Sequence, residues 1–377
     1  MNAIFRLILT STILLASCGK EDPAPTDIEN CPANPFADNF SIRNFRMGFS
    51  TWSYDATLDG RNQTYSFLRN NGDVYSEHID NKIPWSAWMN GTDLPVAFVN
   101  EIQGRVDNKI SSNELVVSVS LLNSARSELA EDFDGTVPAY ISLADQSIED
   151  AYFKHLDYII QQFEPDYFVM AIEVNELRIH SPQKWAEYKV LAGNLRSRLK
   201  SKYPNLKLSE SITLHNWLNP NVSDPQNFIS DVSTYVNQNL DFAAISFYPF
   251  FKNFHLPHEF KSAFDFLHEQ VEKPIAFVET SHLAEDLVIE AFNTNITSNV
   301  CEQKAYLEML LNSAQTKNYE FVIWWAHRDF DALWETFPEE VKDLGRVWRD
   351  TGLLDEKGDK RPAFGVWEDV FESEFQN

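Results

Sequence analysis

Two glutamates lie at or shortly after the ends of apolar stretches of the sequence and could carry out acid–base chemistry together. Glu176 lies just after residues 167–172, and Glu279 directly follows residues 274–278. Cleavage of a glycosidic bond needs one carboxylic acid to protonate the leaving oxygen and a second carboxylate to attack or to activate water. A Glu more often lies in a solvated or salt-bridged loop, but that interpretation suits Glu279 poorly, because the run before it is one that a fold would bury.

Eight apolar runs of strand length predict the elements that must position these glutamates. Each run ends in a polar or aromatic cluster, and its apolar character is continuous, which is typical of a parallel sheet buried on both faces. The runs are residues 46–50, 74–78, 115–121, 167–172, 206–211, 242–247, 275–278 and 321–325. In a closed barrel, the fourth and seventh strands face each other across the mouth.

Segments with a helical period lie between several of these runs and fit crossover helices. We predict one helix capped by Ser147 and ending before Pro165, a second that begins at Gln183, and a third over residues 302–316. Such an alternation can close as a barrel or lie as a doubly wound sheet. We predict an α/β fold, a (β/α)8 TIM barrel, because no dinucleotide fingerprint follows the first run and the polar clusters lie at the C-terminal strand ends.

The order Asn175-Glu176 after the fourth run, with Glu279 closing the seventh, resembles the clan A glycoside hydrolases. These are retaining (β/α)8 enzymes. Matched position by position, the resemblance implies that Glu176 is the general acid/base, Glu279 the nucleophile and Asn175 the residue that holds the sugar 2-hydroxyl. Retention needs the two carboxyl groups about 5–5.5 Å apart. We expect Glu279 to stay ionised and the acid to have a raised pKa.

The resemblance extends over residues 48–367 and includes two further motifs. Residues 245–251 are similar to the corresponding segment of the endo-β-1,4-galactanase family, which implies that Tyr248 hydrogen-bonds the nucleophile. After the eighth run, either Trp324 or Trp325 would be the aromatic floor beneath the sugar at the cleavage point. The implied substrate is a β-linked polysaccharide or oligosaccharide.

Glu173 is an alternative to Glu176 as the acid. By strand alternation Glu173 and Asn175 share one face and Glu176 points to the other, unless a bulge turns Glu176 into the cleft. We favour Glu176 because the Asn-Glu order matches the clan and strand ends often bulge beside active sites.

Other residues at predicted strand ends could bind sugar: Trp52, Asp55, His78, Asp80, Asn123, Arg126, His215, Asn216 and His327. Arg126 could instead pair with a catalytic carboxylate from below. Residues 84–112 form a segment long enough to wall off one end of the cleft, which would favour an exo-acting or oligosaccharide-trimming enzyme. A further alternative is a non-catalytic glycan-binding protein on a barrel scaffold.

The first residues predict an exported lipoprotein with three parts. Residues 1–17 form a signal peptide, since Arg6 precedes an apolar run too short to span a bilayer. Leu-Ala-Ser-Cys resembles the bacterial lipoprotein box, which implies a lipid on Cys18; an ordinary secretory signal is the alternative. Residues 18–40 read as a flexible tether and residues 41–377 as the hydrolase domain. The Lys and acidic residues after Cys18 suggest the outer face of the outer membrane.

Composition restricts the partners further. A net charge of −25 argues against nucleic acid and anionic membranes. Cys31 and Cys301 could form a disulfide in an oxidising compartment or stay free thiols. Because no metal-ligand spacing or phosphate loop is present, we predict no metal and no cofactor. We expect a monomer.

Overall fold

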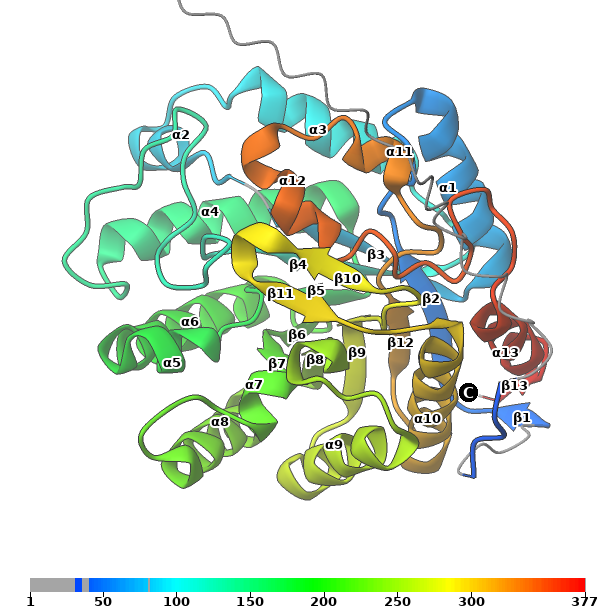
Figure 1. Ribbon diagram of the computed structural model, residues 1–377. Coiled ribbons are helices and arrows are strands. Elements are labelled where there is room, and N and C mark those ends of the chain that lie inside the picture. Colours follow the sequence, from blue (N-terminus) through cyan, green and yellow to red (C-terminus); the bar gives the residue numbers. More distant parts are fainter. Residues whose placement is uncertain (1–30, 36–40, 81, 377) are drawn as a thin grey trace, which may run out of the picture. The chain divides into compact units, whose positions relative to one another are not determined.

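Parallel strands form the centre of the structure, a computed structural model that describes residues 31–35, 41–80 and 82–376 (Figure 1). The strand order is β6-β5-β4-β3-β2-β12-β9-β8-β7, and every neighbouring pair is parallel. The strands are β2 (Arg46–Ser50), β3 (Val74–Ile79), β4 (Glu114–Val119), β5 (Tyr167–Val169), β6 (Lys207–Ser209), β7 (Ser211–Thr213), β8 (Ala243–Phe247), β9 (Ile275–Thr280) and β12 (Phe321–Trp324).

The fifth predicted strand is split into two halves, β6 and β7, which stand at the two ends of this order. β6 pairs with β5 and β7 pairs with β8, while Glu210 between them turns its buried carboxylate to Arg196 and Tyr235. The sheet therefore closes through the split strand as eight barrel strands. The prediction of a (β/α)8 barrel is confirmed.

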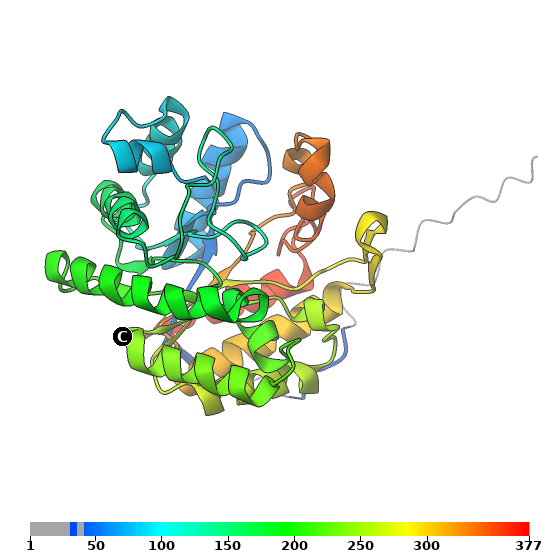
Figure 2. The ribbon, with the colours of Figure 1, turned by 90° about the vertical axis from the view of Figure 1, so that its left-hand side faces the viewer.

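Long helices surround the barrel (Figures 1 and 2). They are α1 (Leu58–Asn71), α3 (Val96–Val106), α4 (Gln146–Phe163), α6 (Pro182–Lys202), α8 (Pro225–Asn239), α9 (Pro257–Gln270), α10 (Val300–Lys317) and α13 (Pro362–Phe371). The three predicted helices correspond to α4, α6 and α10. The predicted cap of α4 is wrong by two residues, because the helix begins at Gln146 with Asp145 as N-cap and Ser147 lies inside the first turn.

Shorter elements lie in the connections. The helices are α2 (Trp85–Asn90), α5 (Glu176–His180), α7 (Leu214–Leu218), α11 (Asp331–Trp334) and α12 (Glu339–Arg346), with 3-10 turns at Pro249–Lys252 and Glu290–Phe292. β10 (Leu287–Ile289) and β11 (Thr294–Ile296) form a hairpin, and β1 (Ile42–Arg43) pairs in parallel with β13 (Glu374–Phe375). Several of these short elements follow barrel strands and so surround the mouth.

The core has two layers, which follow from strand alternation. An inner cluster fills the barrel with Val74, Val116, Tyr167, Val169, Phe242, Ala244, Ala276, Val278, Phe321 and Ile323. A larger cluster packs the outer strand faces against the helices. The side chains two and four residues beyond the inner cluster are thereby aimed at the C-terminal mouth of the barrel.

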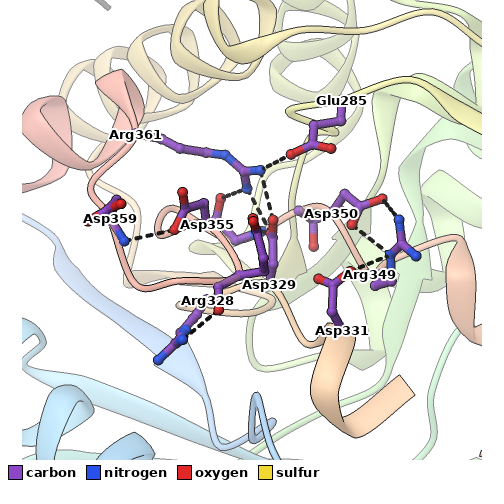
Figure 3. Close-up of polar contacts among 12 residues, drawn as sticks. Glu285, Arg328, Asp329, Asp331, Arg349, Asp350, Asp355, Asp359 and Arg361 are labelled. Carbon is purple, nitrogen blue, oxygen red and sulfur yellow. Dashed lines mark hydrogen bonds and ion pairs between the residues drawn. The ribbon is translucent and has the colours of Figure 1, made fainter. Parts of the chain in front are cut away.

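Ion pairs fix the segment that follows β12, and we call this group the closing cluster: Glu285, Asp329, Asp331, Arg349, Asp350 and Arg361 (Figure 3). Arg361 contacts both oxygens of the buried Asp329 at 2.8 and 2.7 Å and also Glu285 at 2.6 Å. Arg349 donates twice to Asp350, at 2.8 Å each. The cluster ties the chain after β12 to the loop after β9.

The predicted signal peptide and Cys18 lie outside the described residues, as does most of the predicted tether. Pro32–Asn377 is a compact unit in its own right. Within the described ranges no helix is both long enough and apolar enough to cross a membrane. Cys31 and Cys301 are both disulfide-bonded.

Candidate active site

A β-bulge on β9 brings Glu279 into the mouth of the barrel. Against β8, Ile245 pairs with Phe277 but the next residue pairs with Glu279, and the register with β12 shifts at the same place. Val278 still packs in the inner cluster, so strict alternation would turn Glu279 outward. The extra residue turns it inward instead, as bulges beside active sites often do.

Two side chains hold the Glu279 carboxylate. The Tyr248 hydroxyl donates to Oε1, and His78 Nδ1 lies 3.4 Å from Oε2. Both follow from strand parity, since Tyr248 lies four residues after Ala244 and His78 four after Val74. The contact predicted for Tyr248 is present. Burial lowers the pKa of His78 to about 4, so this imidazole is neutral near pH 7.

The pKa of Glu279 is raised to about 8. Burial is the largest cause and the charge of Glu173 the next, while the Tyr248 hydrogen bond and Arg126 oppose the shift. This result runs against our expectation that Glu279 stays ionised at neutral pH, because burial outweighs the hydrogen bond. The carboxyl group is therefore protonated in a large share of the molecules at neutral pH.

Glu173 lies beside Glu279 in an ion-pair network. Its Oε2 accepts from Arg126 Nε at 3.0 Å and its Oε1 from the Ser246 hydroxyl at 2.8 Å. Arg126 also donates to both oxygens of Asp80, at 3.0 and 2.7 Å. We predicted that Arg126 could pair with a catalytic carboxylate; it pairs with Asp80 and Glu173, and no hydrogen bond or ion pair joins it to Glu176 or Glu279 in the described part of the chain. We call Asp80, Arg126, Glu173, Glu176 and Glu279 the central cluster.

The backbone around Glu173 is irregular, so strand alternation does not decide between Glu173 and Glu176. β5 ends at Val169, and Glu173 has a left-handed backbone with φ 54°. A non-glycine residue in that region is uncommon, and such strain clusters at functional sites. The turn lets both Glu173 and Glu176 contribute to the same cluster.

Glu176 is the first residue of α5 and is nearly buried. Its Oε1 accepts from the Asn216 side chain at 2.8 Å. Burial raises the pKa of Glu176, and the Asn216 hydrogen bond opposes that shift. A carboxyl group with a raised pKa suits a general acid, since it keeps its proton close to neutral pH.

Asn175 is fully buried and bound to the neighbouring strand. Its side-chain Nδ2 donates to the Thr213 carbonyl at 3.1 Å, and its Oδ1 accepts from the Thr213 backbone N–H at 2.8 Å. Both ends of the amide are therefore occupied by β7. In this conformation Asn175 fixes the turn that carries Glu176, and its role as a ligand of the sugar 2-hydroxyl stays a prediction.

The two adjacent tryptophans after the eighth run have opposite surroundings. Ile323 belongs to the inner cluster, so Trp325 faces inward and Trp324 packs in the outer core with Nε1 bonded to Thr351. Trp325 lies edge-on to His78, with ring centroids 5.1 Å apart, and 5.4 Å from Trp52. Trp325 is therefore the one placed to form an aromatic floor.

The remaining predicted residues divide in two groups. His215 and Asn216 lie on α7 beside Glu176, and the His215 ring contacts Phe251. His327 is buried against Phe67, with ring centroids 4.6 Å apart, and lies apart from the cavity described next. The sequence reasoning did not identify Ser246, although it lies two residues before Tyr248 on the same strand face.

A cavity of about 540 Å³ extends from the mouth toward α1 and α3. Trp52, Asp55, His78 and Trp325 line it at the mouth, so four predicted strand-end residues share one wall. Asn100, Glu101, Gly104 and Arg105 of α3 line its far side. α3 belongs to residues 84–112, the segment that we predicted could wall off one end of the cleft, and that role stays a prediction.

Three groups of described residues have ligand atoms close enough to share a cation: His255, His282 and Glu302; Glu285, Asp329 and Glu356; Asp329, Asp331 and Asp350. In the last two, Arg361 and Arg349 already pair with the carboxylates. In the first, both ring nitrogens of His282 lie 3.0 Å from backbone carbonyls, and His255 bonds Glu302. These groups are accounted for by hydrogen bonds and ion pairs within the chain.

Comparison with known proteins gives structural likeness without sequence relatives. No protein-family model matches this sequence, and no curated protein matches it. The chain is similar to the Ignisphaera aggregans GH53 catalytic domain, with a TM-score of 0.57, 16% identity, and 92% of this chain and 100% of that one covered. A GH5_18 protein from Bifidobacterium longum subsp. longum, in complex with Manβ1-4GlcNAc, gives a TM-score of 0.62 at 14% identity over 87% and 78%.

A third similar structure is the exo-β-1,4-mannosidase of Opitutaceae bacterium strain TAV5, with a TM-score of 0.60 and 12% identity over 88% of this chain and 59% of that one. At identities this low, the structural likeness shows only that these proteins share the fold of this chain. Function rests on the site itself.

Proposed function

We propose that this chain is a retaining glycoside hydrolase that cleaves a β-linked polysaccharide or oligosaccharide, with Glu279 as nucleophile and Glu176 as general acid/base. The observation that carries the proposal is the bulge that turns Glu279 into the barrel mouth, under the Tyr248 hydroxyl and in the same cluster as Glu176. The glycoside hydrolases among the similar structures support it.

The chemistry follows from these positions. The step requires the ionised form of Glu279: its carboxylate oxygen attacks the anomeric carbon while the bond to the leaving sugar breaks and Glu176 gives its proton to the leaving oxygen. Glu176, now ionised, takes a proton from water, which displaces Glu279 and restores both groups. Glu173 is tied to Arg126 and Ser246 and suits a fixed negative charge better than a proton donor. Its role is then to position Arg126 and to set the pKa of Glu279.

The decisive experiment is Glu279→Gln, measured on a panel of β-glucans, galactans, mannans and xylans. Release of reducing sugar should fall at least about 10⁴-fold while glycan binding persists, because the variant keeps the shape of the cleft and loses the attacking oxygen. Glu290→Gln, an exposed change, is the matched control. If Glu279→Gln is as active as the wild type, the proposed mechanism is wrong. If the wild type binds glycans but cleaves none of them, a non-catalytic glycan-binding protein is favoured.

Retention gives a second test of the same mechanism. The first-formed product should have the β configuration by NMR, and a slow 2-fluoro glycoside should label Glu279, detectable by mass spectrometry of the peptide. An α product would indicate an inverting enzyme in which water attacks directly.

The wall built by α3 favours action at chain ends or on oligosaccharides. An enzyme closed at one side should release one small product from the start of the reaction, and an open cleft should give mixed lengths. Chromatography of early products separates these outcomes. A galactan preference, implied by residues 245–251, is tested by the same panel.

We also propose that the enzyme acts at the cell surface, anchored in the outer membrane by a lipid on Cys18. The support is the signal-like residues 1–17 and the Leu-Ala-Ser-Cys box. Radiolabelled palmitate should be incorporated by the wild type and lost in Cys18→Ser. Labelling that persists in the variant would contradict the anchor.

A further inference from the structure

The cavity between α1 and α3 contains a cation that no carboxylate neutralises. α1 and α3 lie side by side (Figures 1 and 2), and Arg61 of α1 reaches across to α3, where a Cβ added at Gly104 would lie 3.5 Å from Arg61 Nη1. Its guanidinium makes no hydrogen bond or ion pair with any residue in the described ranges, and its Nε is buried without an acceptor. A guanidinium stays charged at every physiological pH.

The second arginine of the cavity is different. Arg105 donates to Glu77 at 2.8 Å and to Glu101 at 3.1 Å, and Glu77 also accepts from Tyr65 and Thr51. Arg105 is thus neutralised by the wall of the cavity. Arg61 is exposed to the cavity without such compensation.

Two carboxylates line the cavity, and each has a partner within the chain. Glu101 is engaged by Arg105, and Asp55 accepts the backbone N–H of Thr57 at 2.8 Å, at the start of α1. Neither of them contacts Arg61. A partly buried guanidinium with free donors favours an anionic oxygen group from outside the chain, since charge-assisted hydrogen bonds to Arg are among the strongest in proteins.

The cavity adjoins the central cluster on the side of Glu279. None of Glu173, Glu176 and Glu279 lines it, but His78 does, and His78 lies 3.4 Å from the Glu279 carboxylate. The general acid stands beside the leaving group, so the side of Glu279 is the one on which the retained sugar would lie. A glycan bound there would lie over the indoles of Trp52 and Trp325 and extend toward Arg61.

We propose that this cavity binds the part of the glycan that stays on the enzyme during cleavage, and that Arg61 binds an anionic substituent on it, a carboxylate or a sulfate ester. The proposal rests on the proposed hydrolase function and adds the chemical class of the substrate.

The test measures binding to the inactive full chain, Glu279→Gln, by calorimetry with three β-linked trisaccharides. One is neutral, one carries a terminal hexuronate and one carries a sulfated terminal hexose. An anionic trisaccharide should bind about 10- to 100-fold more tightly than the neutral one. The tighter of the two identifies the substituent, and the preference should weaken with added NaCl.

Adding Arg61→Gln should reduce that preference to about threefold or less, whereas Arg69→Gln, which removes the same charge from an exposed position of α1, should keep it. Thermal unfolding checks that both variants fold. The effect of NaCl on the anionic preference is measured on the Glu279→Gln chain alone, so that test does not depend on the folding of the Arg61→Gln variant. Equal binding of the three sugars, or a preference that survives Arg61→Gln, overturns the proposal.

The two proposals can fail separately. If the wild type cleaves neutral glycans and the inactive chain shows no anionic preference, only the role of Arg61 is wrong. If the inactive chain binds an anionic sugar through Arg61 while the wild type cleaves no glycan, only the hydrolase function is wrong.

Discussion

The central cluster and the closing cluster are both acidic groups at the C-terminal end of the barrel, but they balance charge differently. In the closing cluster, Arg361 and Arg349 each bind a carboxylate with two contacts. In the central cluster, Arg126 pairs with Asp80 and Glu173. Among the described residues, Glu176 accepts a hydrogen bond from the uncharged Asn216 and Glu279 accepts one from the uncharged Tyr248. One group fixes the chain, and the other leaves two carboxyl groups able to exchange protons.

Burial does not distinguish the two clusters. It raises the pKa of Asp329 to about 8, as it does for Glu279. The partners make the difference, because Arg361 contacts both Asp329 oxygens and opposes the shift, whereas the Glu279 carboxylate meets a tyrosine hydroxyl and a neutral imidazole. A buried acid is therefore a candidate for catalysis when no cation is committed to it.

The comparison of the two clusters predicts its largest effect on activity for Glu176, the proposed general acid. Glu176→Ala should reduce kcat/KM by about 10²–10⁴-fold on glycans, because the leaving oxygen then departs without a proton. Aryl glycosides with acidic leaving groups should be affected much less, and the loss of rate at high pH should disappear from the profile. Kinetics with matched aryl and oligosaccharide substrates measure all three.

Glu173→Gln is the matched comparison for Glu176→Ala. It should also lower the rate, since Arg126 loses a partner, but an acidic leaving group should not restore activity. If the rescue instead occurs for Glu173→Gln and not for Glu176→Ala, Glu173 is the acid.

Arg126→Met should have the next largest effect on activity. It leaves Asp80 and Glu173 without their cation, and kcat/KM should fall by about 10²-fold. Arg126 lowers the pKa of Glu279, so its removal raises that pKa further and moves the rising, acid-side limb of the pH profile to higher pH. A pH profile that keeps its shape would show that Arg126 acts on structure alone.

The sequence predicted the fold more fully than the site. Continuous apolar runs placed all eight strands, because a strand that is buried on both faces has apolar residues at nearly every position. Glu176 and Glu279 were singled out because they lie at strand ends and match the clan A resemblance, and Tyr248 because residues 245–251 resemble the galactanase family. An irregular backbone after the fourth run was expected, but not its form, a left-handed turn at Glu173. The β9 bulge was not predicted, because it depends on the register of neighbouring strands, which leaves no signal in residue type.

The choice between Trp324 and Trp325 was within reach of the sequence. Alternation from Phe321 and Ile323 turns Trp325 inward once the strand is known to be regular there. Arg61 could not be identified from the sequence. Its proposed role depends on the absence of an ion-pair partner among the described residues, and this can be seen only once α3 is placed beside α1.

For the closing cluster we expect an effect on stability rather than on activity. Asp329→Asn replaces the carboxyl group that Arg361 contacts through both oxygens, and losing this buried pair should cost about 3–5 kcal/mol, or roughly 4–7 °C in Tm. Activity per folded molecule at 25 °C should stay within about threefold of the wild type. Asp331→Asn, which loses only a 3.4 Å contact to Arg349, is the milder control. A large loss of activity at unchanged Tm would place the cluster in the reaction and erase the comparison.

The smallest expected effect is on thermal stability, and it tests whether the pKa of Glu279 is raised in the folded chain. Its pKa in the folded chain, about 8, lies above the ordinary 4.5, so the folded state binds this proton more tightly than the unfolded state. The stability that this provides is complete below about pH 4.5 and is lost as pH rises toward 8. Because glutamine does not titrate, the Tm of Glu279→Gln should exceed that of the wild type by a margin that grows from pH 5 to pH 9, reaching roughly 2–6 °C. Calorimetry across that range measures it. A margin that is constant with pH would mean that the Glu279 carboxyl group has the same pKa in the folded and the unfolded chain, which would contradict this prediction.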